Sequence, residues 1–178
     1  MLALDSEEAK EMVRTLLFWK GKLHLSKNQY SSAQRVFEEV LVTLEEIDPK
    51  SPLVLNALAF LVEIHEKRRN RDQATKYALE VGRRSALYNL DYSLPLYKAP
   101  VKGPTSGSRK KGKVKVSFTI DEEGYVINPE VSSSDMSFSY EKATLNTILK
   151  FRYAPKFQNG KPVKSGNHHY TVSWNTRD

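Results

Sequence analysis

The chain has 178 residues, of which 39% are hydrophobic and 28% charged, proportions that exclude a disordered or fibrous protein and fit one ordinary domain or two small ones. Cysteine is absent, which excludes disulfides, thiolate metal sites and cysteine nucleophiles. No apolar run approaches the roughly 18 residues of a membrane helix, and the first eight residues do not resemble a signal peptide. Composition therefore leaves both a periplasmic and a cytoplasmic location open.

The net charge of +7 arises from one segment. Residues 1–97 hold 14 basic and 14 acidic side chains and residues 117–178 hold 7 and 7, whereas residues 98–116 hold 7 basic side chains and no acid. Arg109, Lys110 and Lys111 lie where this segment is also rich in Pro, Gly and Ser. Aromatic residues are not interleaved with the charges, so the segment is interpreted as a solvated linker rather than a nucleic-acid site.

The first half predicts four helices, since apolar residues recur at helical spacing between short breaks. In the first helix, residues 7–25, the expected apolar positions are Val13, Leu16, Leu17 and Leu23. The second is expected to be capped by Ser31 or Ser32 and to bury Ala33, Val36, Phe37, Val40, Leu41 and Leu44. The third covers about residues 53–67, and the fourth follows a cap at Asp72 and carries Ala74, Tyr77, Ala78 and Val81.

The helices show a weak internal repeat. Ala33 and Ala74 lie 41 residues apart, and similar apolar residues stand at matching offsets around them. With Gly21 and Phe37 at the positions of a close helix crossing, the pattern resembles the tetratricopeptide repeat (TPR). Lys20 departs from that family, and an unrelated four-helix bundle would give the same periodicity.

The second half changes to the alternating pattern of strands. Residues 113–120 and 125–131 are predicted to form a hairpin around Gly124, with Pro129 indicating an edge or a bulge. A helix follows, capped by Ser139, with Phe138 packing over Ala143 from outside and a buried face of Ala143, Leu145, Ile148 and Leu149. Asn159-Gly160 predicts a tight turn, and residues 168–174 predict a last strand. The expected fold class is α+β: helical hairpins, then a three-stranded antiparallel sheet with one helix.

Residues 112–126 look like the first hairpin of the TonB carboxy-terminal domain. The Phe-Arg-Tyr-x-Pro motif of residues 151–155 and the Gly-Lys-Pro-Val motif of residues 160–163 are similar to the segment after that family's helix. The resemblance covers about residues 94–175. Where the family has a Tyr-Pro pair before the first strand, this chain reads Leu94-Pro95-Leu96-Tyr97, and residues 102–111 add a basic insert.

The resemblance implies binding by strand addition, in which the edge of the sheet captures an extended segment of an outer-membrane transporter. The implied binding residues on the last strand are His168, His169, Tyr170, Thr171, Val172, Ser173 and Trp174, and those in the lead-in are Pro95, Leu96 and Tyr97. About half of the strand's side chains would simply face solvent or core. The expected domains are a TPR-like domain at 1–90, a linker at 91–112 and a TonB-like domain at 113–178 with its lead-in from about 94.

Catalysis finds no support in the sequence. His24 and His65 occupy equivalent repeat positions, where packing explains them, and His168 and His169 are neighbours on a strand and point to opposite faces. No nucleophile elbow or phosphate-binding loop occurs. We therefore expect a protein without enzymatic activity, cofactor or metal site.

The first hypothesis is a periplasmic TonB-like protein supporting TonB-dependent uptake. It would bind a transporter segment at the sheet edge and a second envelope protein, such as an inner-membrane motor or TonB component, through its TPR surface. The alternative is a TPR scaffold or assembly adaptor of the envelope that uses the TonB-like fold without transporter coupling. A third is a cytoplasmic nucleic-acid adaptor that uses Arg109, Lys110 and Lys111. A homodimer is compatible with each.

Overall fold

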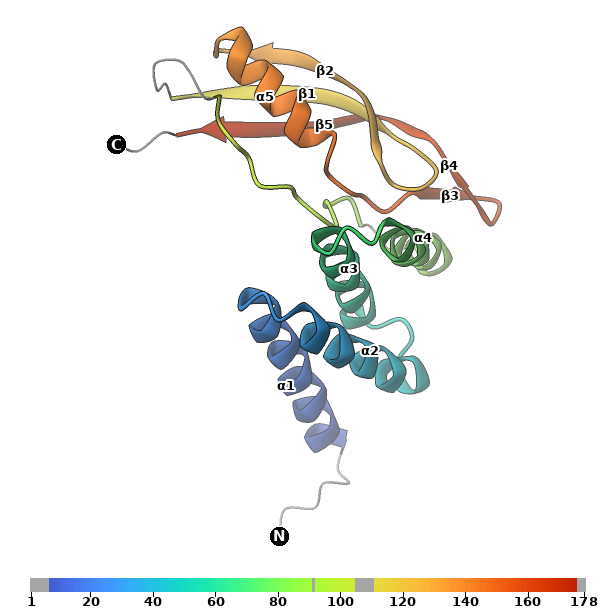
Figure 1. The fold of residues 1–178 in the computed structure, drawn as a ribbon. Coiled ribbons are helices and arrows are strands. Elements are labelled where there is room, and N and C mark those ends of the chain that lie inside the picture. Colours follow the sequence, from blue (N-terminus) through green and yellow to red (C-terminus); the bar gives the residue numbers. More distant parts are fainter. Residues whose placement is uncertain (1–6, 91, 105–110, 176–178) are drawn as a thin grey trace.

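The computed structural model describes residues 7–90, 92–104 and 111–175, in which a helical half precedes a sheet half (Figure 1). The helical half consists of α1 (Glu7–Ser26), α2 (Tyr30–Ile47), α3 (Pro52–Lys67) and α4 (Arg71–Tyr88). The sheet half consists of β1 (Gly112–Ile120), β2 (Val126–Ser134), α5 (Phe138–Ile148), β3 (Lys156–Gln158), β4 (Lys161–Val163) and β5 (Ser165–Trp174). The expected α+β class is confirmed.

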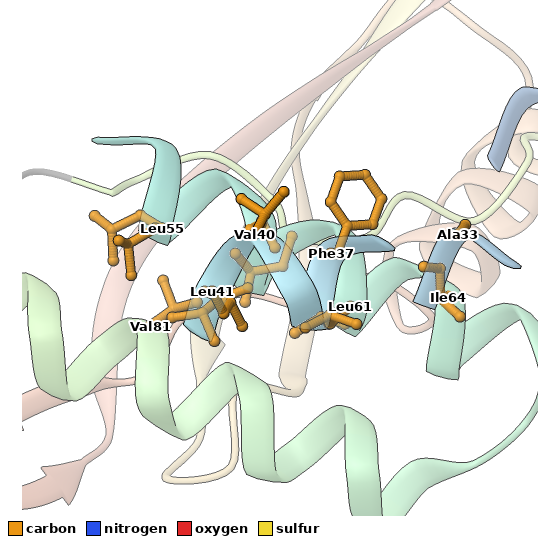
Figure 2. Packing of buried hydrophobic residues seen from close by; sticks show 14 of the residues in the cluster. Ala33, Phe37, Val40, Leu41, Leu55, Leu61, Ile64 and Val81 are labelled. Carbon is orange, nitrogen blue, oxygen red and sulfur yellow. The ribbon is translucent and has the colours of Figure 1, made fainter. Parts of the chain in front are cut away.

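Successive helices of the helical half pack on one another, α1 on α2, α2 on α3 and α3 on α4, which is compatible with a helical repeat. Their core includes Phe37, Val40, Leu61 and Ile64, gathered between the helices in Figure 2. Gly21 lets α1 approach α2, because an added Cβ would lie 2.8 Å from the Phe37 ring. None of the described helices is long and apolar enough to cross a membrane.

The buried face of α1 differs from the expected one. Val13, Leu16 and Leu23 are exposed, and the helix instead buries Arg14, Phe18, Gly21 and Leu25. The guanidinium of Arg14 pairs with Glu11 at 3.1 Å, which helps to compensate a charge on the inner face. The prediction was wrong because it followed apolar residues alone, whereas the buried stripe includes an arginine and a glycine.

Three predicted caps also differ. α2 begins after Gln29 without a side-chain cap, and the α4 cap is Asn70, which accepts a hydrogen bond from the backbone N–H of Gln73. The residue before α5 is Ser137, so Phe138 is the first helical residue and, at 78% exposure, does not pack over Ala143. In α5 the face also differs: Leu149 is exposed, while Tyr140, Thr144, Thr147 and Ile148 are buried.

The three long strands form one antiparallel sheet in the order β2-β1-β5, so that β1 is central. α5 packs on β1 and β2 and lies across one face of the sheet (Figure 1). Beneath it lies a second core built from alternating strand residues and from the segment after the helix: Val114, Val116, Phe118, Ile120, Val126, Ile148, Phe151, Tyr153, Val172 and Trp174. The other face of β1 and β5 is polar and open to solvent.

β3 and β4 pair as a short hairpin that the sequence predicted only as a turn. Asn159 and Gly160 both have positive φ, 51° and 74°, as the two central residues of a hairpin turn require. The hairpin projects onto α4. Gly82 permits this contact, since a Cβ there would overlap the carbonyl oxygen of Pro155 and lie 3.1 Å from the Phe157 ring.

Arg152 is the second contact between the two halves, and it is fully buried. Its Nε lies 3.0 Å from Oε1 of Glu66 on α3, and its Nη2 donates to Oγ1 of Thr75 on α4 at 2.6 Å. Its guanidinium also stacks 3.4 Å from the centre of the Tyr125 ring, while its backbone bridges to Tyr97. The halves are therefore packed together through a buried charge.

Candidate functional site

The candidate site is the outer edge of β5. In the described part of the chain β5 pairs with β1 alone, over the register Gly112↔Trp174 to Phe118↔His168 without a shift. A free edge is a row of unpaired N–H and C=O groups that can receive another strand. Seven consecutive regular residues give this edge the length of a typical strand.

The sheet has a second outer edge, on β2, but that strand is irregular. Its pairing with β1 shifts twice, and Asn128 and Pro129 have no partner in the register. Asn128 has a φ of 49°, and Pro129 has no N–H to donate. Bulges and proline are the features that protect an edge against pairing. The two edges are therefore not equivalent, and β5 is the one suited to strand addition.

Hydrogen bonds on β1 establish which β5 backbone groups face outward. The Lys113 N–H donates to Oδ1 of Asp135 at 2.6 Å, and its carbonyl accepts from the Asp135 N–H at 3.3 Å, so Lys113 points its backbone toward the end of β2. In an antiparallel pair, both polar groups of one residue point to the same side. Ser173, opposite Lys113, therefore presents its N–H and C=O to the outer edge, and by the two-residue period so do Thr171 and His169.

The side chains of the seven predicted strand residues divide by face. His169, Thr171 and Ser173 are exposed on the open face, whereas Val172 and Trp174 are buried and His168 and Tyr170 are half-buried. This alternation agrees with the expectation that about half of them face solvent or core. Strand addition uses backbone N–H and C=O groups, so residues of β5 with buried side chains remain part of the candidate edge.

The inward side chains fix β5 to the domain. The Trp174 indole N–H donates to Oγ1 of Thr144 on α5 at 3.1 Å, and its ring meets Tyr140 edge-on. His168 stacks on Phe118 with ring centres 5.8 Å apart, and its Nε2 lies 2.9 Å from the Ser165 hydroxyl. Burial, followed by the positive charges of His169 and Lys156, lowers the pKa of His168. A neutral imidazole is therefore favoured beside this edge.

The lead-in, residues 95–104, borders β5 on the α5 side. Lys98 lies 5.4 Å above the Tyr170 ring, and a Cβ on Gly103 would lie 3.6 Å from the Trp174 ring. Among the predicted lead-in residues, Pro95 and Tyr97 are half-exposed, but Leu96 is 5% exposed and packs in the core of the helical half. The lead-in thus reaches the site mainly through the residues after Tyr97.

The predicted basic linker residues are not part of this edge as far as it is described. Arg109 and Lys110 lie outside the described residues, and Lys111 is exposed immediately before β1. Within the described ranges, no group of three or more His, Asp or Glu side chains is placed to hold a metal ion.

Sequence reasoning missed the role of Arg152. The Phe-Arg-Tyr-x-Pro motif that supported the family resemblance places Phe151 and Tyr153 in the core of the sheet half and Arg152 between the halves. An arginine between two aromatic residues was the available signal, because a charge within an apolar run usually has a buried partner. The partner, Glu66, is 86 residues away in sequence, which no local pattern shows.

A second exposed feature lies on α1. Met12, Leu16, Trp19 and Leu23 recur at three- and four-residue spacing and are 54–66% exposed. Such a stripe is typical of a helix face that packs against another protein element. It lies on the opposite half of the molecule from the β5 edge (Figure 1).

These features define a protein-interaction module: a small sheet with one regular open edge, attached to a stack of helices. Residues 107–176 match the family model described as Gram-negative bacterial TonB protein C-terminal, so the sheet half is a TonB carboxy-terminal domain. The match indicates a TonB-like envelope protein involved in transport energy coupling, and the domain of that family is a protein-interaction domain. No curated protein matches the chain.

Proposed function

We propose that this protein acts in the periplasm of a Gram-negative cell, where the β5 edge captures an extended segment of a TonB-dependent outer-membrane transporter. The observation that carries the proposal is the difference between the two sheet edges. β5 offers seven regular residues with outward N–H and C=O groups at His169, Thr171 and Ser173, whereas β2 is interrupted at Pro129. Main-chain hydrogen bonds would supply the affinity, and the side chains that flank the edge would supply the specificity.

The helical half serves as the docking module for a second envelope protein. The exposed stripe on α1 supports this role, since four large apolar side chains in one row are costly to leave in water. A component of the TonB motor system is the partner proposed for it. The same stripe also supports the alternative function, a scaffold that uses the helical half and does not engage transporters.

The test is a titration of the isotope-labelled full chain with short peptides from transporter amino termini, followed through backbone amide shifts. We expect shifts at residues 168–174 and in the adjoining lead-in at residues 97–99. Thr171→Pro removes one outward N–H and should weaken peptide binding at least tenfold, while the matched variant Thr171→Ala, which keeps the N–H, should bind within twofold of the parent.

Two outcomes would overturn transporter capture. One is the absence of shifts at millimolar peptide in a folded protein, which would leave the scaffold function. The other is equal loss of binding in Thr171→Pro and Thr171→Ala, which would show that the side chain and not the open backbone edge is recognised. Amide spectra of both variants without peptide control for folding.

A further inference from the structure

A cleft of about 970 Å³ lies at the junction of the two halves, away from the outward backbone of β5. One wall is the turn between α3 and α4, another is the lead-in from Tyr97 to Lys102, and the third is the end of α5 from Ala143 to Phe151. We call it the junction cleft. Its volume is at the upper end of the roughly 300–1,000 Å³ range of small-molecule sites, and its long walls suit a stretch of polypeptide.

The junction cleft has an excess of positive charge. Its cations come from three separate segments: Arg69 and Arg71 from the turn, Lys102 from the lead-in and Lys150 from the end of α5. The single acid in the lining, Glu66, already faces Arg152 at 3.0 Å. Among the described residues, no ion pair engages any of the four cations, although Lys67, at the end of α3 beside the turn, is paired with Glu63.

The backbone adds to this positive potential. α4 begins at Arg71, so the positive end of its helix dipole lies at the same cleft. Asp72 in the first turn of α4 offsets part of this charge, but Arg69 and Arg71 place two cations at the same end, which is the opposite of the arrangement that stabilises a helix. Cations gathered in a concave site focus the field and raise the local concentration of anions. The charges of the cleft are thus arranged for a negatively charged ligand.

The floor of the junction cleft is apolar. Ala99, Val126 and Phe151 are buried there at 2–6% exposure, and the rings of Tyr97 and Tyr125 are half-exposed along it. On the rim, Leu149 is 45% exposed. A small inorganic anion would leave this apolar surface uncovered. A ligand that combines carboxylates with an apolar side chain covers the floor and meets the charged rim together.

An adjoining hollow of about 480 Å³ extends the cleft along the lead-in toward the turn between α1 and α2, where Asn28 and Tyr30 line it. It shares Glu66, Arg69, Tyr97 and Pro100 with the junction cleft and adds Lys67 and Lys98. Its other acid, Glu63, is paired with Lys67 at 2.8 Å. The two hollows together form a continuous basic trough along the lead-in, which is the shape expected for an extended chain.

We propose that the junction cleft binds an acidic segment of a partner protein, with an apolar side chain between its carboxylates seated on the Phe151 floor. The proposal states which kind of segment the second partner would present. It rests on the proposed function only in assuming that a second partner exists. Since the walls come from both halves, the segment binds only while the halves are packed as described.

The test uses the full chain and a fluorescent synthetic peptide, Gly-Glu-Glu-Phe-Glu-Glu-Gly, in anisotropy titrations at low salt. A second peptide with Gln in place of every Glu should bind at least tenfold more weakly, and so should a peptide with Gly in place of Phe. The double variant Arg69→Gln/Arg71→Gln should weaken binding at least tenfold. The matched control Lys76→Gln/Lys164→Gln removes two exposed cations outside the cleft and should change binding less than twofold.

Any of the following results would overturn the inference: no binding at millimolar peptide, equal loss in the two double variants, equal binding of the Gln peptide, or displacement of the peptide by inorganic phosphate at equal concentration. The last would indicate a small-anion site. Vesicles with anionic lipid that compete as well as the peptide would likewise overturn it, in favour of a membrane surface.

The variant Thr171→Pro separates this inference from strand capture. Binding of the acidic peptide should be unchanged in Thr171→Pro, with amide shifts at Ala99 and Lys150. If Thr171→Pro abolishes binding of the acidic peptide, the cleft is not the site, although strand capture stands. If the acidic peptide binds the cleft and transporter peptides do not bind β5, the inference stands and the transporter function fails.

Discussion

The buried pair Arg152–Glu66 should hold the two halves together, and its contribution can be worked out from the structure. The Nε–Oε1 distance is 3.0 Å, with the arginine side chain 0% exposed and the glutamate side chain 13% exposed. At an effective dielectric constant of about 20, two unit charges at that separation attract each other by roughly 5 kcal/mol. The Nε–H does not form a hydrogen bond with this oxygen, and Nη1 of Arg152 has no hydrogen-bond partner among the described residues.

Desolvation of both groups offsets much of this attraction, so the coupling free energy should be smaller than the Coulomb value. Arg152→Met leaves the Glu66 carboxylate nearly buried without a counter-charge and also removes the hydrogen bond to Thr75. We expect this variant to lose about 3–5 kcal/mol in the free energy of unfolding, and Glu66→Gln to lose a similar amount. The double variant should lose about 1.5–3 kcal/mol less than the sum of the single losses.

The assay is urea denaturation of the four proteins, followed by tryptophan fluorescence and far-UV circular dichroism. Lys67–Glu63, a half-exposed pair within α3 at 2.8 Å, is the matched control, and its coupling should be about 0.3–0.5 kcal/mol. Single losses at Arg152 and Glu66 that add within about 0.5 kcal/mol would refute the reasoning, because additivity is the mark of independent residues.

Three further predictions concern the junction, the pH response and the surface of α1. Gly82→Ala should cost about 1–3 kcal/mol in a denaturation experiment, since the new methyl group overlaps the Pro155 carbonyl; a neutral effect would mean that α4 and the β3–β4 hairpin do not pack as described. Because the pKa of His168 is lowered in the folded state, the folded protein binds fewer protons than the unfolded chain. The contribution of neutral His168 to the free energy of unfolding is therefore fully present above the unfolded pKa of about 6.5, and it is lost as the pH falls through the folded pKa. His168→Phe, which keeps a ring against Phe118, should therefore make the free energy of unfolding less dependent on pH between about 7.5 and 5, and identical pH slopes would contradict this cause. On α1, Trp19→Gln should change stability by less than about 0.5 kcal/mol while its neighbour Phe18→Ala costs about 3–5 kcal/mol in urea titrations, and a large loss at Trp19 would show that the exposed stripe belongs to the core.

The sequence was sufficient to predict the fold class because the periodicities are strong. Ala33, Phe37 and Val40 recur at helical spacing and are all buried, as are the alternating Val114, Val116 and Phe118 of β1. The prediction was wrong for α1, because apolar residues occur on both faces of this helix. The face that contains Gly21 is buried, since a residue without a side chain permits the close approach to Phe37. Which face of α1 is buried therefore depends on packing against α2, and the spacing of apolar residues in α1 does not show it.

The candidate edge could be predicted in outline but not in detail. The alternation of residues 168–174 and the family resemblance pointed to the last strand. The sequence could not show that the strand order is β2-β1-β5, that the β2 edge is broken, or that Thr171 points its N–H outward, because each depends on register between distant segments. The sequence also could not predict the junction cleft, because Arg69, Lys102 and Lys150 come together only in the folded chain.

The proposed function requires that a load applied at β5 reach the helical half, and two packed contacts join the halves. One is the β3–β4 hairpin, which precedes β5 in the chain and packs on α4 at Gly82. The other runs from β5 through the Trp174–Thr144 hydrogen bond into α5, and from the end of α5 directly into Arg152 and its contacts with Glu66 and Thr75. Both contacts are packed before any load is applied. Because the Arg152 contact lies directly after α5, which is hydrogen-bonded to the end of β5, its loss should weaken the transmission of a load from the sheet edge to the helices.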